Sequence, residues 1–225
     1  MKQYSIAIDG PAGSGKSTVA KEIAKKLGIL YVDTGAMYRT VGLYCIKNGI
    51  DLQQQSHIVS ALKKIDMKIE LSDGMQMIFL NGENVTQKIR TQEAGKAASA
   101  VAAILPVREK LVEIQRNLAK GHSVIMDGRD IGTNVLPDAA VKIYLNASVE
   151  QRTKRRCYEL AMMGKTWDKK QIEQQIIQRD ESDMNRKYHP LKKAEDAIEI
   201  DTSFMSIEEV VFKILNIVEE KIKKI

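Results

Sequence analysis

Apolar residues along the chain follow two recurring patterns. Short apolar runs, typical of buried strands, occupy residues 4–9, 29–32, 123–126, 141–145 and 197–200. Between these runs, apolar side chains recur every three or four positions, which is typical of amphipathic helices. The predicted helices cover residues 16–27, 36–48, 56–64, 93–103, 106–121, 148–164, 169–184 and 206–222. This alternation predicts an α/β fold in which helices surround a five-stranded parallel sheet.

One segment departs from this alternation of strands and helices. Residues 67–71 alternate between apolar and polar, residues 72–74 have turn chemistry, and residues 75–80 run back toward Asn81-Gly82. Both turns are strong hairpin signals. The sequence therefore predicts a small antiparallel β insert packed beside the main sheet.

Helix ends carry recognisable capping residues. Gly28 is expected to end the first helix, because glycine readily adopts the left-handed conformation found there. Capping-box patterns start two later helices, with Ser148 placed before Gln151 and Ser206 before Glu209. Thr34 is a candidate cap for the helix over residues 36–48.

The first apolar run leads into a segment that matches G-x-x-x-x-G-K-[ST], the phosphate-binding P-loop. Its residues are Gly10, Pro11, Ala12, Gly13, Ser14, Gly15, Lys16, Ser17 and Thr18. The glycines allow backbone N–H groups to turn toward phosphate oxygens. Lys16 is expected to reach the β- and γ-phosphates, and the Ser17 hydroxyl to bind Mg²⁺. The strand before this segment and the helix after it favour a P-loop over an ordinary glycine-rich turn.

Charged residues follow the second and third predicted strands. Residues 33–39 include Arg39, which we expect in the first turn of its helix, where a cation opposes the helix dipole and therefore indicates a bound anion. Residues 127–130 read Asp-Gly-Arg-Asp. Because ligands bind at the carboxyl ends of parallel strands, both segments are expected beside the P-loop. Asp127 either supports Mg²⁺ through water or belongs to a plain strand-end turn.

Length and composition limit the class of protein. With 225 residues, 44% of them hydrophobic, the chain suits one α/β domain with an insertion or lid and no membrane span. No secretory signal is recognisable, so we expect a cytoplasmic protein. Cys45 and Cys157 have no metal-binding spacing and are expected to be free thiols.

The net charge of +6 is concentrated in one segment. Residues 151–193 hold 12 Lys and Arg against 6 Asp and Glu, whereas the rest of the chain is balanced. Such a segment is either a nucleic-acid-binding surface or a mobile cationic cover over a small polyanionic substrate. It contains few aromatic residues and no nucleic-acid motif, which favours the cover.

Six motifs, in order along essentially the whole chain, identify a family. They read IDGPAGSGKST, VDTGAMYR, IRTQEAGKAAS, VRE, DGRDIGT and QRDESDMNR. Together they resemble the bacterial cytidylate kinases, which are nucleoside monophosphate kinases with a three-layer P-loop fold. The resemblance implies transfer of the γ-phosphoryl group of ATP, with Mg²⁺, to CMP or dCMP. No strong base is expected, because a phosphate is itself the nucleophile.

The resemblance also implies residue roles. Gly10 to Thr18 would hold the ATP phosphates, and Lys16 would stabilise the transition state with Arg39 and Arg129. Asp130 would accept a hydrogen bond from the cytosine amino group, which would disfavour UMP. The acceptor nucleotide would contact Thr34, Arg39, Ser99, Arg108, Arg129, Asp130, Arg179, Asp183 and Arg186.

The remaining expectations concern the helical lid and the division of the chain. Arg155, with Arg152 and Arg156, would close over ATP, although a solvated helix face explains these arginines equally well. The core would comprise residues 1–35, 104–150 and 195–225, the NMP-binding region 36–103 and the lid 151–194. The resemblance suggests a monomer that uses small nucleotides and binds neither nucleic acid nor membrane.

Two alternative functions stay open at this point. One is another small-molecule P-loop kinase, acting on UMP or on a non-nucleotide acceptor. The other is a nucleotide-dependent RNA-binding or regulatory protein, to which the basic segment and the pI of 9.1 point.

Overall fold

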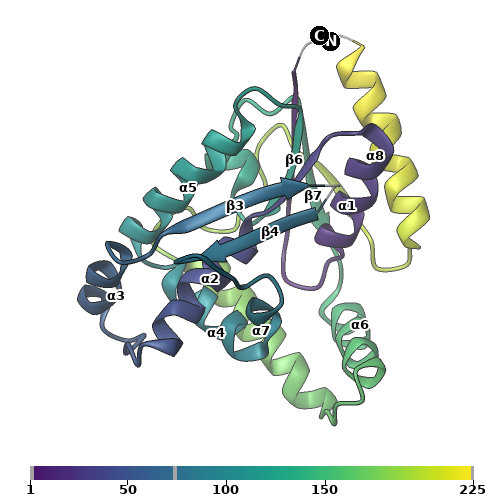
Figure 1. Ribbon diagram of the computed structural model, residues 1–225. Coiled ribbons are helices and arrows are strands. Elements are labelled where there is room, and N and C mark those ends of the chain that lie inside the picture. Colours follow the sequence, from purple (N-terminus) through teal and green to yellow (C-terminus); the bar gives the residue numbers. More distant parts are fainter. Residues whose placement is uncertain (1–2, 73–74, 224–225) are drawn as a thin grey trace.

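A five-stranded parallel sheet forms the centre of the computed structural model, which describes residues 3–72 and 75–223 (Figure 1). The order across the sheet is β2-β6-β1-β7-β8, and every neighbouring pair is parallel. The strands are β1 (Ser5–Asp9), β2 (Leu30–Asp33), β6 (Val124–Gly128), β7 (Val141–Asn146) and β8 (Ile198–Asp201). The predicted α/β fold with five parallel strands is confirmed.

Helices cover both faces of this sheet and give the molecule three layers. Successive residues of β1 face opposite sides, so that Ala7 joins one apolar cluster and Ile6 and Ile8 join the other. The cluster around Ile6 and Ile8 is covered by α1 (Lys16–Leu27) and α8 (Ile207–Ile222). Residues of four further helices fill the cluster around Ala7. These are α2 (Thr34–Lys47), α3 (Gln55–Leu62), α4 (Gln92–Val101) and α5 (Leu105–Ala119).

The predicted antiparallel insert is present as a separate small sheet. It consists of β3 (Met67–Ser72), β4 (Met75–Leu80) and β5 (Glu83–Asn84), in that order. Asn81 and Gly82 both have positive φ, 50° and 82°, as a tight hairpin turn requires. The sequence did not predict β5, which has only two residues. The turn predicted at 72–74 lies partly outside the described residues, which exclude 73 and 74.

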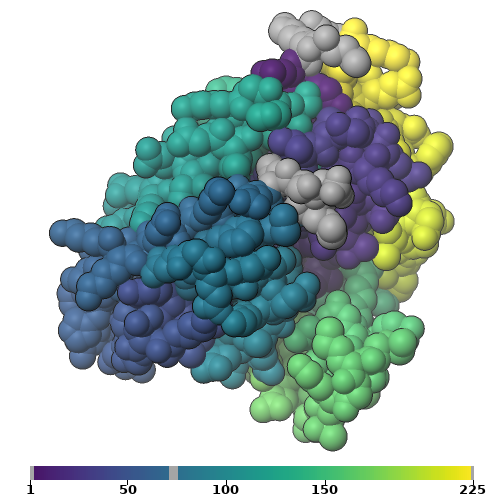
Figure 2. Space-filling model, in the orientation of Figure 1, coloured from purple at the N-terminus to yellow at the C-terminus, as the bar shows by residue number. Residues whose placement is uncertain are grey.

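Two helices form the basic segment, and its visible part is drawn in green at the lower right of Figure 2. They are α6 (Val149–Met162) and α7 (Lys169–Asn185). Cys157, Ile172 and Ile176 form a small apolar cluster between them. Cys157 and Cys45 are both buried free thiols, as expected. None of the helices within residues 3–72 and 75–223 is long and apolar enough to cross a membrane.

Three predicted helix ends match the structure. Gly28 has φ 64° at the C-terminus of α1, and the Ser206–Glu209 capping box of α8 is complete. At the start of α6, the Ser148 hydroxyl accepts a hydrogen bond from the Gln151 N–H.

Two predictions about α2 were wrong. Asp33, rather than Thr34, caps this helix, because the Asp33 carboxylate accepts the Ala36 N–H at 2.9 Å. Thr34 is instead the first helical residue, which moves Arg39 from the first turn to the second. Two short elements were also not predicted, the 3₁₀ turn η1 (Lys88–Arg90) and the π-helical turn η2 (Ile131–Val135).

Candidate functional site

The P-loop connects the carboxyl end of β1 to the first residue of α1. Gly10 has φ 146°, and a Cβ atom there would lie 2.0 Å from the Leu145 carbonyl oxygen in β7. Gly13 and Gly15 have φ 76° and 89°, in the left-handed region. The loop therefore keeps its path only with glycine at these positions, as the sequence predicted.

Lys16 folds back over this loop. Its ammonium donates hydrogen bonds to the Pro11 carbonyl at 2.6 Å and to the Ser14 hydroxyl at 3.2 Å. Only 5% of the residue is exposed. Burial, and next the charge of Arg129, hold the pKa of the Lys16 ammonium well below its ordinary value. The ammonium is thus a desolvated cation beside the loop, where an added phosphate charge would interact strongly with it.

Ser17, Asp127 and Tyr31 form a connected polar group at the start of α1. Ser17 Oγ donates to Asp127 Oδ2 and Tyr31 Oη donates to Asp127 Oδ1, both at 2.8 Å. Burial, and next the charge of Asp33, raise the pKa of Asp127 to about 6. Tyr31 was missed in the sequence because it lies inside an apolar strand. The contact between Asp127 and Ser17 favours a supporting role for Asp127 over a plain strand-end turn.

Asp9 ties the end of β1 to the segment that follows Asp130. Its carboxylate accepts the backbone N–H groups of Ile131 and Gly132, each at 2.7 Å. Burial raises the pKa of Asp9 to about 6, against the opposing effect of these hydrogen bonds. The buried carboxylate thereby fixes η2 next to the P-loop strand.

Asp130 lies at the centre of a buried cluster of donors. Arg108 and Arg186 form ion pairs with opposite oxygens of its carboxylate, the second at 3.0 Å, and Asn134 donates to Oδ2 at 3.0 Å. Arg108 is 1% exposed, and its guanidinium lies 5.6 Å from the centre of the Tyr38 ring. The cluster joins three predicted acceptor residues, Arg108, Asp130 and Arg186, which are far apart in sequence.

A second ion-pair cluster lies on α7. Arg129 donates to Asp183 Oδ2 at 2.7 Å. Burial alone would raise the pKa of Asp183, but the charges of Arg129 and Arg179 outweigh it and lower that pKa. Burial and the neighbouring Arg129 lower the pKa of Arg179 to about 10, and its Nε has no hydrogen-bond partner among the described residues. Arg129 and Arg179 together carry two positive charges against the single negative charge of Asp183. The net positive charge that remains can bind an anion.

The other predicted acceptor residues are Arg39, Thr34 and Ser99. Arg39 donates to the carbonyls of Ile89 and Thr91 at 3.4 and 3.3 Å. Thr34 Oγ1 donates to the Asp127 carbonyl at 2.8 Å, which links α2 to β6. Ser99 is half-buried on α4. Arg39 therefore has neutral partners and no hydrogen bond to a carboxylate among the described residues.

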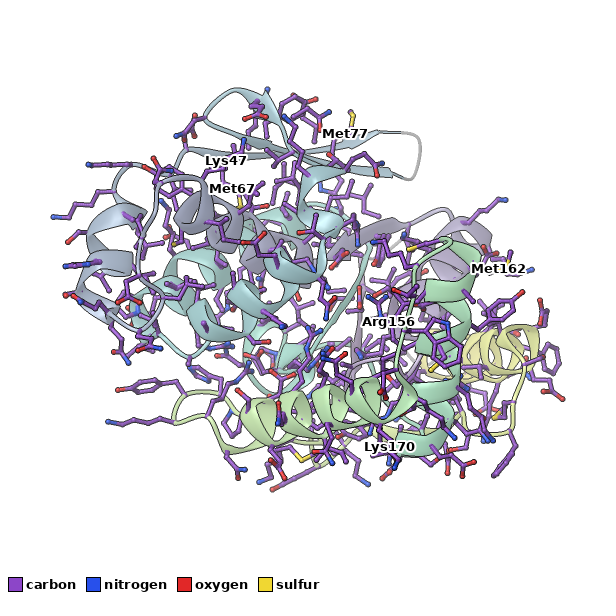
Figure 3. All side chains as sticks on the ribbon, turned by 90° about the horizontal axis from the view of Figure 1, so that it is seen from below. Lys47, Met67, Met77, Arg156, Met162 and Lys170 are labelled. Atoms are coloured by element: carbon purple, nitrogen blue, oxygen red, sulfur yellow. The ribbon has the colours of Figure 1, made fainter. Side chains whose placement is uncertain are left out.

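The three lid arginines occupy different environments. Arg152 is buried and donates to the Ala12 carbonyl at 3.1 Å while pairing with Asp180 at 2.5 Å. Arg155 donates to the hydroxyl and carbonyl of Thr202. Arg156 is 41% exposed beside Glu159, on the α6 surface shown in Figure 3. Arg152, which contacts the Ala12 carbonyl of the P-loop, is therefore not on a solvated face, whereas Arg156 is partly exposed.

Comparisons with known proteins show the family of this chain. A family model described as cytidylate kinase matches residues 6–220. The chain belongs to the cytidylate kinase family. It is 51% identical over 223 residues to the cytidylate kinase of Caldicellulosiruptor bescii, covering 99% of both chains. It is 48% identical over 217 residues to that of Bacillus cereus, covering 96% of both. The family resemblance seen in the six sequence motifs is confirmed.

A solved structure also shares the fold. It is the crystal structure of an uncharacterized protein from Eubacterium ventriosum, with TM-score 0.51 and 14% identity. The match covers 96% of this chain and 99% of the other. At this identity the likeness bears on the fold alone.

Proposed function

We propose that this cytidylate kinase family member transfers the γ-phosphoryl group of ATP to CMP or dCMP, producing ADP and CDP or dCDP. The observation that carries the proposal is a group of cations at the P-loop: Lys16 is buried, and Arg129 and Arg179 lie close enough for their charges to act on it. Two phosphorylated substrates need such charge on both sides of the transferred group.

Positioning and charge neutralisation supply the catalysis. The P-loop amides and Lys16 bind the ATP phosphates, and Arg129, with Arg39, binds the phosphate of the acceptor. This phosphate is ionised near neutral pH, so the site needs no general base. Lys16 then stabilises the charge that develops on the transferred phosphoryl oxygens.

The Ser17 hydroxyl and the Asp127 carboxylate, beside the P-loop, suit the binding of a Mg²⁺ ion. Ser17 would bind the ion directly, and Asp127, hydrogen-bonded to Ser17, would hold its shell through water, because hydroxyl and carboxylate oxygens are the ligands that Mg²⁺ prefers. The ion, when bound, neutralises charge on the ATP phosphates. Tyr31 keeps the Asp127 carboxylate turned toward Ser17.

Asp130 explains a preference for cytosine. Its carboxylate accepts hydrogen bonds from Arg108, Arg186 and Asn134, and a carboxylate paired with two arginines presents acceptors to a further partner. A cytosine amino group is a donor, whereas uracil presents a carbonyl at the same position. UMP would leave a buried carboxylate facing an acceptor, and this penalises its binding.

The remaining assignments follow the family resemblance. Thr34, Ser99, Arg108, the α7 residues Arg179 and Asp183, and Arg186, which follows α7, complete the acceptor site, while Arg155 lies on the ATP side. Residues 36–103 form the NMP-binding region and residues 151–194 the lid, on a core of residues 1–35, 104–150 and 195–225. The enzyme works as a cytoplasmic monomer on free nucleotides.

An ADP-release assay over a panel of nucleoside monophosphates tests the proposal. CMP and dCMP should be the best acceptors, and Asp130→Ala should reduce the preference for CMP over UMP more than it weakens ATP binding. Unchanged discrimination in Asp130→Ala would remove its base-reading role. UMP, AMP or a non-nucleotide outperforming CMP would overturn the proposed function, as would nanomolar, strongly salt-dependent RNA binding with turnover intact in Lys16→Ala.

A further inference from the structure

Asn134 contacts the carboxylate that is proposed to read the base. Its Nδ2 donates to Asp130 Oδ2 at 3.0 Å. We propose that Asn134 is a positioning residue that sets base specificity by fixing how the Asp130 carboxylate is turned. This inference rests on the proposed function and assigns a role to a residue outside the sequence motifs that identify the family.

The π-helical turn η2 places Asn134 close to Asp130. The Asn134 N–H donates to the Asp130 carbonyl at 3.0 Å, so the two residues are already joined through the backbone. The Asn134 carbonyl in turn accepts from Arg116 Nη2 at 2.7 Å, and the neighbouring Val135 carbonyl accepts from Arg116 Nε at 3.1 Å. Arg116, on α5, therefore holds the backbone of Asn134 in place. The amide side chain therefore starts from a backbone position that is fixed close to Asp130.

The two oxygens of the Asp130 carboxylate accept different numbers of hydrogen bonds. An ionised carboxylate oxygen accepts about two hydrogen bonds. Oδ2 accepts from both Arg108 and Asn134, whereas Oδ1 accepts, among the described residues, from Arg186 alone. The remaining acceptor position is therefore on Oδ1. The amino group of the base should bind there.

The direction of the Asn134 amide follows from the same contacts. Because the Asp130 carboxylate acts as an acceptor toward both arginines, the side-chain atom of Asn134 that faces it is the NH₂ donor. Without this donor, Oδ2 would regain a free acceptor position. The carboxylate could then turn or bind water, and its geometry toward the base would be less strictly defined. The predicted consequence is a loss of discrimination and not only a loss of stability.

Three substitutions separate these effects. Asn134→Leu keeps the approximate volume and removes the donor, Asn134→Asp replaces the donor by a second carboxylate, and Asn134→His restores a donor at a similar position through ring Nδ1. Thr133→Ala is the matched control, because Thr133 is the exposed neighbour in the same turn. Steady-state kinetics with CMP and UMP would be combined with calorimetric binding of each monophosphate and a thermal melt.

Asn134→Leu should lower kcat/KM for CMP about tenfold, the usual effect of losing a hydrogen bond to a charged group. The CMP to UMP ratio should fall while the KM for ATP stays unchanged. Asn134→Asp should lose more, because it places like charges together. Asn134→His should recover part of the loss, and Thr133→Ala should match the wild type.

A CMP to UMP ratio that stays at the wild-type value in both Asn134→Leu and Asn134→Asp would overturn the inference. So would a fall in thermal stability alone, since that would mark Asn134 as merely structural. Calorimetry measures the preference for CMP over UMP in binding alone, without catalysis. Failure of the proposed function is distinguishable, because it would appear in the wild-type enzyme as a missing preference for CMP.

Discussion

The side-chain amide of Gln76 pairs with both backbone polar groups of Asp33. Gln76 Oε1 accepts the Asp33 N–H at 2.7 Å, and Nε2 donates to the Asp33 carbonyl at 3.2 Å. Gln76 belongs to the antiparallel insert, whereas Asp33 ends a strand of the main sheet and caps α2. Arg90, from η1, also pairs with the Asp33 carboxylate at 3.1 Å. The insert is therefore fixed directly to the strand end where the proposed acceptor site begins.

Replacing Gln76 by alanine should loosen this connection. Two hydrogen bonds of about 1 kcal/mol each would be lost, next to Thr34. We expect a severalfold higher KM for CMP, an unchanged KM for ATP and faster hydrogen exchange at the Asp33 amide. The exposed Gln53→Ala is the control. Equal exchange rates in both variants would show that the amide pair does not hold the insert.

Removing the charge of Lys16 should affect the chemical step most. Lys16→Met should lower kcat by about 100-fold or more, because an oriented cation stabilises the transition state more than the bound substrates. Binding of a fluorescent ATP analogue should weaken much less. The exposed Lys25→Met, in the same helix, should leave both quantities unchanged. A loss confined to ATP binding would contradict the role given to the ammonium.

Burial of Asp9 should make stability fall as the pH rises. Its pKa is raised to about 6 in the folded protein, so the folded chain holds this proton more tightly than the unfolded chain. The corresponding stability, about 3 kcal/mol at most, is present below about pH 4 and is lost as the pH rises through about 6. Denaturant unfolding at several pH values should show this decline in the wild type.

Asp9→Asn should lack that part of the decline, since its side chain does not titrate. The exposed Asp138→Asn should retain it. A pH dependence of unfolding that is identical in Asp9→Asn and the wild type would rule out Asp9 as its source. The comparison concerns the slope with pH, so a uniform loss of stability in Asp9→Asn does not affect it.

The two arginines Arg152 and Arg156 should differ sharply on substitution. Arg152→Met leaves Asp180 buried without its partner and should destabilise the fold by roughly 3–5 kcal/mol. Arg156→Met removes an exposed pair and should change the free energy of unfolding by less than about 1 kcal/mol. Chemical denaturation measures both. Similar values for the two variants would contradict the buried position of Arg152.

Local features of the chain were predictable from the sequence. The path of the P-loop depends on glycines that adopt positive φ, and the strands depend on short apolar runs. Both features are visible in the amino-acid sequence itself. Asp33 and Thr34 are both good caps with similar local chemistry, and the choice of Thr34 failed because its hydroxyl bonds to Asp127 in the neighbouring strand β6. Such a partner, distant in the chain, leaves no periodic pattern.

The polar contacts of the site were less accessible to sequence reasoning. The family motifs named Arg108, Asp130 and Arg186 but did not show that they pair with one another. Asn134 and Gln76 had no signal at all, since one follows a motif and the other lies in an alternating strand. Their contacts depend on the π-helical turn and on how the insert packs against the main sheet. Both are features of the tertiary structure, which local sequence preferences do not determine.

The strand order has a consequence for how the chain folds. β1 pairs with β6 and β7, so Ser5 lies beside Val124 and Ile6 beside Val141. During synthesis, the P-loop strand lacks both neighbours until more than half of the chain has been made. Such distant pairings form slowly. The first motif to leave the ribosome should therefore acquire its shape late, and nucleotide binding would report that β1, β6 and β7 have paired.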